Sequence, residues 1–379
     1  MKPRTKGFSF EVKATDGHAR RAVFTTPHAI VDTPTFMPVG TQGSVKTLTP
    51  EEVARTGAQI VLGNTYHLWL RPGADLVAKM GGLHAFTKWP RAMLTDSGGF
   101  QAFSLSKLTK LDEDGFTFQS HLDGSKHHLS PEEAVRVQGL LGADIQMQLD
   151  VCPKGQAPRE EVEEAVARTT RWARRALAAA RPENQALFGI VQGACFPDLR
   201  KAHAEELAAL DPGFDGLALG GFSVGEPIDN MHACLQEVAH LVDAERPRYL
   251  MGVGTMRDLL DAIAAGIDMF DCVLPTRNAR NGQALTRFGR VVIKQARYRE
   301  DPLPIDPDCA CPACRGGFSR AYLRHLFMAG EILALRLLSI HNLHAMGKLA
   351  RDAREAIESG TYEAFRRSAL QALADGERN

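Results

Sequence analysis

The chain has little of several features that would assign a protein to a common class. It carries 45 basic and 45 acidic residues among 379, so its formal net charge is zero and no global field draws it to a polyanion. No apolar run approaches the roughly 20 residues that a membrane span needs. We therefore expect no membrane segment, and any nucleic-acid binding must use a local basic surface.

The start of the chain lacks a secretory signal, and its cysteines are not arranged as disulfide partners. Basic residues near position 1 are followed by the alternating Phe8-Ser9-Phe10-Glu11-Val12, not by a continuous apolar segment. The 7 cysteines are odd in number, and three of them crowd between Cys309 and Cys314. This usage favours a reducing compartment and a bound metal, and we expect a cytoplasmic protein.

The pattern of apolar segments predicts an α/β fold, a (β/α)8 TIM barrel with insertions. Eight short apolar segments, most of them followed by Gly or polar residues, alternate with helical patterns that have clear start signals, such as Thr49-Pro50-Glu51-Glu52 and Ser130-Pro131-Glu132-Glu133. The Asp-Gly pair within 117–125 predicts an inserted hairpin. The expected strands are 34–39, 59–63, 92–96, 145–150, 187–192, 216–220, 248–253 and 267–273.

We expect three parts in the chain. Residues 1–300 would form the barrel with an N-terminal β segment, 301–345 a zinc-binding subdomain near the C-terminus, and 346–379 C-terminal helices that pack on the barrel. The strand ends would gather at one face of the barrel, where the loops between strands and helices build the site.

Two carboxylates stand where burial makes them costly. Asp271 lies in the apolar run 266–275, and Asp96 closes the run 92–95 just before Ser97-Gly98-Gly99. A buried carboxylate is expensive unless chemistry needs it. Two of them at strand ends suggest a paired acid and nucleophile site.

Three closely spaced cysteines and a distant histidine predict a metal centre. Cys309, Cys311 and Cys314 are followed by His341, with a helical pattern over 319–338 between them. Three thiolates and one imidazole fill a tetrahedral zinc shell and leave no position for a reactive water, so we expect structural zinc. His344 and His325 compete with His341 for the fourth position.

A local basic stretch begins just after the last predicted strand. Seven cations and no acid occur between 277 and 299: Arg277, Arg280, Arg287, Arg290, Lys294, Arg297 and Arg299. Beside a candidate catalytic acid, this stretch favours binding of a phosphate backbone. Arg315, Arg320 and Arg324 would extend the same face.

Taken together, these motifs resemble the bacterial tRNA-guanine transglycosylases, which exchange the wobble guanine of certain tRNAs for a 7-deazaguanine. The resemblance covers nearly the whole chain. It rests on the residues quoted above and on the motifs at 63–68, 95–101, 188–193, 220–226 and 268–277.

The resemblance implies roles for individual residues. Asp271 would be the nucleophile, Asp96 the general acid/base, and Asp150, Gln192 and Gly221 the readers of guanine. Ser97, Phe100 and Val224 would also contact the base, with Phe100 stacking on it, and Arg277 and Arg280 would bind tRNA.

The resemblance also implies the substrates and the assembly. Val224, with Cys152, points to preQ1 (7-aminomethyl-7-deazaguanine) as the incoming base, guanine as the outgoing base, and the anticodon loop of tRNAs with a GUN anticodon as the acceptor. The chain has Val151 where bacterial members usually carry an acid. Relatives are homodimers, so we expect a homodimer.

Two other functions would use some of the same features. A carbohydrate hydrolase also needs paired carboxylates, but its groove would be lined by more aromatic residues than 3 Trp and 5 Tyr provide. A non-catalytic tRNA-binding subunit would have no need to retain Asp271, Asp96 and Asp150 together. An archaeal-type enzyme would usually carry an appended RNA-binding domain, for which the segment after His341 is too short.

Overall fold

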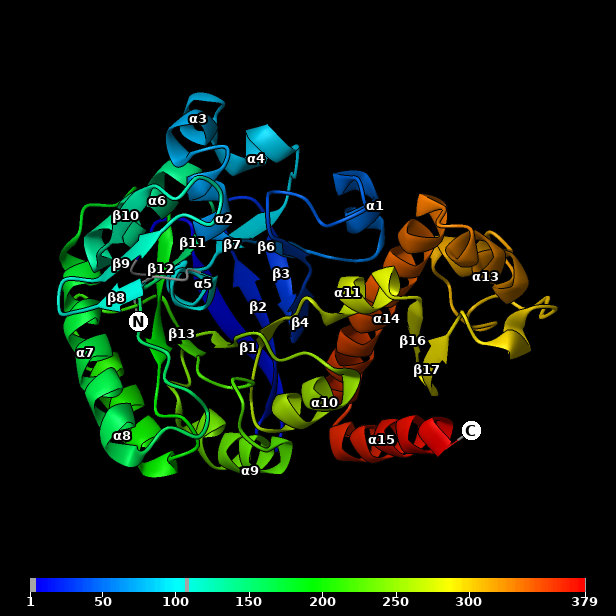
Figure 1. The fold of residues 1–379 in the computed structure, drawn as a ribbon. Coiled ribbons are helices and arrows are strands. Elements are labelled where there is room, and N and C mark those ends of the chain that lie inside the picture. The colour runs from blue at the N-terminus through cyan, green and yellow to red at the C-terminus, as the bar shows by residue number, and fades with distance from the viewer. Residues whose placement is uncertain (1–4, 106–108, 379) are drawn as a thin grey trace.

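The computed structural model, which describes residues 5–105 and 109–378, contains a closed parallel barrel (Figure 1). The first barrel strand is split at Pro38 into β4 (Thr35–Met37) and β5 (Val39–Gly40). Because β4 pairs with β15 (Met269–Asp271) and β5 pairs with β6 (Ile60–Gly63), the sheet closes on itself. The intervening order is β14 (Arg248–Leu250), β13 (Gly216–Leu219), β12 (Ala186–Val191), β11 (Ile145–Met147) and β7 (Ala92–Thr95). The predicted (β/α)8 barrel is confirmed.

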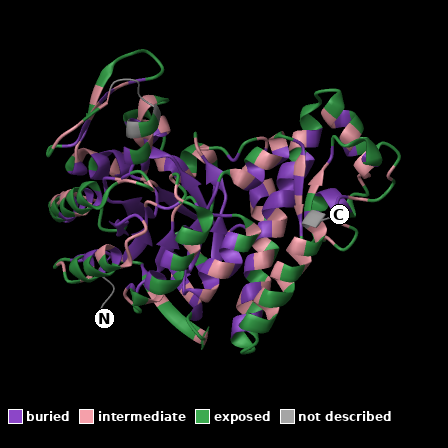
Figure 2. Cartoon of the chain, turned by 60° about the horizontal axis from the view of Figure 1, so that its bottom comes forward, coloured by how far each residue is buried: buried purple, intermediate pink, exposed green. Residues whose placement is uncertain are grey.

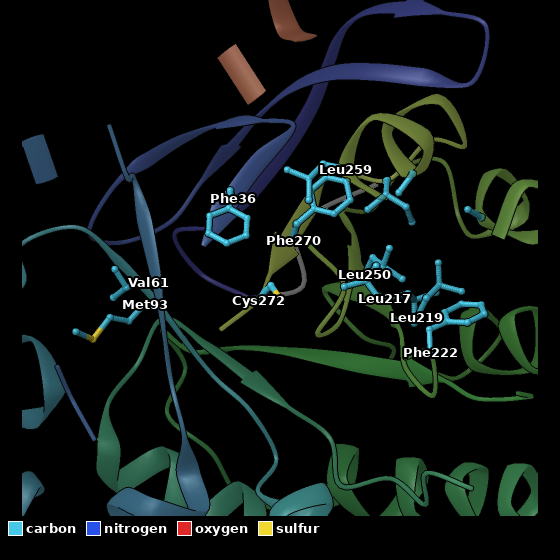
Figure 3. Packing of buried hydrophobic residues seen from close by; sticks show 14 of the residues in the cluster. Phe36, Val61, Met93, Leu217, Leu219, Phe222, Leu250, Leu259, Phe270 and Cys272 are labelled. Carbon is cyan, nitrogen blue, oxygen red and sulfur yellow. The ribbon is translucent and has the colours of Figure 1, made fainter. Parts of the chain in front are cut away.

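Successive side chains of each barrel strand point alternately inward and outward, and they form two apolar layers. Inward-facing residues such as Leu62, Phe188 and Met269 form one cluster inside the barrel, and outward-facing ones such as Val61 and Phe270 form a second under the helices. Figure 3 shows part of the outer layer, and Figure 2 shows burial concentrated in the barrel strands. Asp271 lies two residues after Met269 on the same strand, so its side chain also points into the barrel.

An antiparallel sheet closes the end of the barrel where the strands begin. It consists of β1 (Ser9–Asp16), β2 (Ala19–Thr25) and β3 (Ile30–Thr33), and it adds Phe24 and Val31 to the inner cluster. The Thr5 hydroxyl donates to Asp215, which lies just before β13. With this end filled, the opposite end, where the strands finish, is left for a site. Residues 1–4 of the basic N-terminus lie outside the described residues.

Helices surround the barrel, and their start signals match the sequence predictions. Thr49 caps α1 in a capping box with Glu52, and the Ser130 hydroxyl accepts from Glu133 at the start of α6. The helices of the barrel region are α1 (Pro50–Arg55), α2 (Thr65–Leu70), α3 (Ala74–Lys79), α4 (Gly82–Thr87), α5 (Gly99–Leu105), α6 (Pro131–Leu141), α7 (Arg159–Ala178), α8 (Pro197–Ala208), α9 (Ile228–Val238), α10 (Met256–Ala264) and α11 (Leu274–Arg280), with a 3-10 turn at Ala239–Leu241.

The predicted insertion between β7 and β11 is a three-stranded sheet. It contains β8 (Thr109–Leu111), β9 (Phe116–Gln119) and β10 (Lys126–Leu129), and β9 and β10 form the expected hairpin around Asp123-Gly124. Trp172 of α7 donates to the Glu113 carbonyl, so the insertion is fastened to the barrel wall.

The C-terminal region carries the cysteine cluster and two long helices. It comprises β16 (Gln283–Thr286), β17 (Gly289–Val292), a 3-10 turn at Ala296–Tyr298, α12 (Pro312–Arg315), α13 (Arg320–Met328), α14 (Ile332–Glu358) and α15 (Tyr362–Arg378). The single helical pattern expected over 319–338 is wrong, because the chain breaks at Gly330 with φ +76°. Helix α14 contacts β16 and α13 as well as β1, β2 and β4, and it runs through residues 345 and 346, where a boundary was expected (Figure 1).

Among the described residues, no helix combines the length and the apolar composition that crossing a bilayer requires.

Candidate active site and metal centre

Five of the predicted site residues lie where the barrel strands end. Asp271 ends β15, Asp96 follows β7, Asp150 follows β11, Gln192 follows β12, and Gly221 follows β13. The carboxyl ends of parallel barrel strands open onto one face, so these residues converge there.

Asp271 is held by one of its two carboxylate oxygens. The Tyr249 hydroxyl donates to Oδ1 at 2.6 Å and the Gly252 N–H donates to the same atom at 2.7 Å. No donor among the described residues reaches Oδ2. Burial raises the pKa of Asp271, while the two donors lower it. A carboxylate anchored at one oxygen with the other open is suited to attack an electrophilic carbon.

Asp96 is held by both of its oxygens. The Thr65 N–H donates to Oδ1 at 2.8 Å and the Asn64 amide donates to Oδ2 at 2.5 Å. Burial, together with the nearby charge of Asp271, raises the pKa of Asp96 to about 7 against the lowering effect of its hydrogen-bond donors. A carboxyl group that titrates near neutrality can accept and return a proton at working pH.

Asp150 lies among hydrogen-bond donors on the neighbouring strands. Gln192 Nε2 donates to Asp150 Oδ2 at 2.6 Å, and the Ser97 side chain also hydrogen-bonds to this carboxyl group. Burial raises the pKa of Asp150 to about 6 despite these donors. Gln192 Oε1 is buried and has no partner. Asp150 therefore presents acceptor oxygens, and Gln192 an acceptor oxygen with a second amide hydrogen.

Gly221 begins a tight turn that Glu226 stabilises. Gly221 and Ser223 both have positive φ, at +68° and +58°. The Glu226 carboxylate accepts from the Ser223 N–H and from the Val224 N–H. A Cβ on Gly221 would collide with Gln192 Oε1, so only glycine fits there. Val224 is half-buried in this turn.

Phe100 and Cys152 lie near Asp150. They adjoin a cavity of about 200 Å³ whose lining also includes Gly99 and Val151. Phe100 is 49% exposed, so it is not part of the apolar core. Burial and the nearby Asp150 raise the pKa of Cys152 to about 12, so this thiol stays neutral.

Two unpaired cations follow Asp271 directly. Arg277 and Arg280 lie at i and i+3 on α11, and neither forms an ion pair with any described residue. Desolvation and the charge of Arg277 lower the pKa of Arg280, and one of its Nη atoms is buried without a partner. Within the same basic region, Arg287 and Arg320 are instead paired with Asp308 and Asp301.

The structure brings the four predicted metal ligands together. The donor atoms of Cys309, Cys311, Cys314 and His341 lie within 4.8 Å of one another. His341 Nδ1 lies 3.5 Å from the Cys311 sulfur and 3.4 Å from the Cys314 sulfur, while its Nε2 lies 2.8 Å from the Leu285 carbonyl oxygen. The Leu285 contact keeps the proton on Nε2 and leaves Nδ1 free to bind a metal. These residues can hold a metal ion, and His325 is exposed on α13, outside the cluster.

Sequence reasoning placed Asn64 at the strand ends and Glu226 in a motif, but it did not predict which groups hold the site residues in place. Tyr249 and Gly252 hold Asp271, Thr65 and Asn64 hold Asp96, and Glu226 holds the turn after Gly221. The alternation of side chains along the strands could have identified Tyr249. It points into the barrel from the strand beside β15, and its register partner is Met269.

The chain is similar over most of its length to known proteins of one family. Residues 15–375 match the family model described as queuine tRNA-ribosyltransferase. A queuine tRNA-ribosyltransferase of Sorangium cellulosum is 69% identical over 98% of this chain and 94% of the relative. The proteins of the same name from Solidesulfovibrio magneticus and Fusobacterium nucleatum are 54% and 50% identical, over 97% and 96% of this chain and 99% and 97% of the relatives.

Proposed function

The chain belongs to the queuine tRNA-ribosyltransferase family, an enzyme family of guanine modification in tRNA, and we propose that it exchanges the wobble guanine of GUN-anticodon tRNAs for preQ1. The observation that carries the proposal is the pair of differently held carboxylates. Asp271 has one anchored and one open oxygen, whereas both oxygens of Asp96 are held.

In the proposed reaction, Asp271 Oδ2 attacks the ribose carbon as the bond to guanine breaks, and the protonated Asp96 gives its proton to the departing ring nitrogen. The transition state resembles an oxocarbenium ion, which a carboxylate on the opposite face of the sugar can capture as a covalent intermediate. The Tyr249 and Gly252 donors hold Oδ1 so that Oδ2 faces the sugar. Asp96 then removes the proton from the ring nitrogen of the incoming base, and this nitrogen displaces Asp271.

The residues after β11, β12 and β13 are suited to reading guanine. The ring N–H and the exocyclic amine of guanine are donors, which match the acceptor oxygens of Asp150. The guanine carbonyl oxygen is an acceptor, which matches the second Gln192 amide hydrogen and the Gly221 N–H. Phe100, exposed on α5, is suited to stacking on a base drawn out of the loop.

The turn held by Glu226 supports preQ1 as the incoming base. Because the Ser223 N–H points at Glu226, the Phe222 carbonyl oxygen of the same trans peptide points away from this carboxylate. We assign this oxygen as the acceptor for the ammonium group of preQ1. Val224 limits the space beside it to a small substituent.

Arg277 and Arg280 are the proposed tRNA contacts. They lie one helix away from the nucleophile and lack internal partners among the described residues, so phosphate oxygens can occupy both guanidinium groups.

Zinc is the proposed metal of the cysteine and histidine cluster. Three thiolates and one imidazole form a closed tetrahedral donor set of the kind that structural zinc takes. The ion would join the loop around Cys309 to α14 and would not touch the reacting atoms.

We also propose a homodimer that assembles through the region beside the metal. The apolar side chains of Met328 and Ile332 are 61% and 69% exposed there, near the exposed Tyr322 and Leu333. Exposed apolar clusters of this kind mark interfaces. Since tRNA is the substrate, we place the reaction in the cytoplasm.

Incorporation of labelled guanine and of labelled preQ1 into unfractionated tRNA tests the proposal. We expect label only at the wobble base, and wild-type protein incubated with tRNA should form a covalent adduct. Asp271→Asn should lose both exchange and adduct while keeping its thermal stability near that of the wild type. Label at another nucleotide, or exchange retained by Asp271→Asn, would refute the assignment.

A further inference from the structure

Arg200 is a fully buried cation that forms no ion pair with any described residue. It lies on the first turns of α8, directly after the Gln192 loop, and is 0% exposed. Burial lowers its pKa. A buried charge without a counter-ion costs several kcal/mol unless hydrogen bonds compensate for it, so a specific task is expected of this residue.

The Arg200 guanidinium joins the two loops that carry the guanine readers. It donates to the carbonyl oxygens of Val191, the last residue of β12, and of Ala194, on the loop that follows, at 3.3 and 2.5 Å. It also donates to the carbonyl oxygens of Gly220 and Gly221, at 2.8 and 3.4 Å, on the loop after β13.

The guanidinium also stacks 3.7 Å from the centre of the Phe222 ring. Figure 3 shows Phe222 beside Leu217 and Leu219, at the end of the outer apolar layer. The cation is therefore enclosed by carbonyl dipoles and one aromatic face, all belonging to the ends of β12 and β13.

These bonds fix the direction of a group that reads the base. In a trans peptide the C=O and the N–H point in opposite directions. Because the Gly220 carbonyl points at Arg200, the Gly221 N–H of the same peptide points away from it. The loops are also strained: Ala194 has φ +45° although it is not a glycine, and Arg200 holds its carbonyl.

His203 holds the other reader from the next turn of the same helix. Its Nδ1 accepts from the Gln192 N–H at 2.9 Å. Burial lowers the pKa of His203 to about 4, so the ring is neutral and Nδ1 can accept. Arg200 and His203 lie at i and i+3 and share one face of α8.

We propose that Arg200 and His203 are positioning residues that set the geometry of base recognition. They hydrogen-bond to the backbone next to Gly221 and at Gln192, on the side away from the base. This rests on the proposed function, since it assigns the two groups to the readers of the exchanged base. It predicts that their loss weakens binding of the free base more than binding of tRNA, because tRNA affinity comes mainly from phosphate contacts on α11.

The test is steady-state kinetics of labelled guanine exchange, with KM for guanine and KM for tRNA measured separately. Arg200→Lys should raise KM for guanine about tenfold or more, the size expected when buried carbonyls lose their donors, and leave KM for tRNA within about twofold. His203→Leu should also raise KM for guanine, whereas His203→Asn, whose side-chain oxygen can replace Nδ1, should restore it.

Arg248→Lys is the matched control. Arg248 is also buried and also donates to carbonyl oxygens, those of Gly266 and His240, but at the opposite end of the barrel. The Arg248→Lys substitution should lower the melting temperature without changing KM for guanine.

Unchanged KM for guanine in folded Arg200→Lys, or parallel rises in both KM values, would overturn the inference. If Arg200→Lys does not fold, the two His203 variants provide the test. Equal KM values for guanine in His203→Leu and His203→Asn would overturn the inference. Absence of exchange in the wild-type protein would instead refute the proposed function.

Discussion

Tyr249→Phe is the sharpest test of how the proposed nucleophile is tuned. The substitution removes only the hydroxyl that donates to Asp271 Oδ1 at 2.6 Å and leaves the Gly252 N–H on the same oxygen. A hydrogen bond to a charged group contributes about 1.5–3 kcal/mol, and 1.36 kcal/mol corresponds to one pH unit. Burial already raises the pKa of Asp271 and Tyr249 opposes this rise, so the variant should have a still higher pKa.

The sign of the effect on activity follows from the role of the ionised form. Asp271 must be a carboxylate to attack the ribose, so activity falls as the pH drops through its pKa. Loss of the Tyr249 donor should move this acid limb of kcat/KM toward higher pH by about one pH unit or more. Well above the limb, exchange should persist, because Oδ1 keeps one donor.

The assay is labelled guanine exchange measured across the pH range, with Tyr362→Phe as the control. Tyr362 is also a buried tyrosine with one hydroxyl hydrogen bond, 2.7 Å to the Leu260 carbonyl, but it lies on α15. Its substitution should reduce stability by about 1 kcal/mol and leave the pH profile unchanged. An unmoved acid limb in Tyr249→Phe, or equal shifts in both variants, would refute the reasoning.

Three further predictions concern the acid, the metal and the cations. The pKa of Asp96 rises from 3.8 in the unfolded chain to about 7 in the folded one, so this group should lower wild-type stability by up to about 4 kcal/mol as the pH rises from about 4 to above 7. Asp96→Asn should be inactive, and in urea unfolding at several pH values its stability should fall less than that of the wild type by about this amount; equal falls in the two proteins would contradict the prediction. Cys311→Ser should lower the zinc content and the melting temperature together, whereas Cys195→Ser should change neither; a stable, zinc-free Cys311→Ser protein would argue against a structural ion. Arg280→Glu should weaken tRNA binding and flatten its salt dependence, while Arg174→Glu on α7 should not; an unchanged salt slope would remove Arg280 from the tRNA surface.

The parts of the fold predicted correctly are those encoded by local pattern. The barrel followed from alternating apolar segments and helix caps, and Asp271 was conspicuous because a carboxylate interrupts an apolar strand. The cluster that could hold a metal was found because three of its four members are closely spaced cysteines. By contrast, the break at Gly330 was missed because the apolar periodicity resumes at Ile332 and resembles one continuous helix.

The residues that hold the site were missed because their roles depend on neighbours far away in the sequence. Arg200 stands in the segment Pro197-Asp198-Leu199-Arg200-Lys201, where an arginine normally faces water. Only the convergence of the ends of β12 and β13 surrounds it with carbonyl oxygens. Tyr249 similarly resembles a core tyrosine until the pairing of β14 with β15 places its hydroxyl against Asp271.

In the proposed reaction, the order of strands around the barrel separates the residues that recognise the base from the residue that attacks the sugar. Asp150, Gln192 and Gly221 follow three consecutive strands, β11, β12 and β13, whereas Asp271 lies on β15, with β14 between. A base held against the first three strands would place its sugar toward β15. Asp96 follows β7, on the other side of β11, so it flanks the base instead of lying behind the sugar. In the proposed reaction this spacing lets Asp271 attack the sugar from one face while Asp96 exchanges a proton with the base on the other, without either carboxylate leaving its hydrogen bonds.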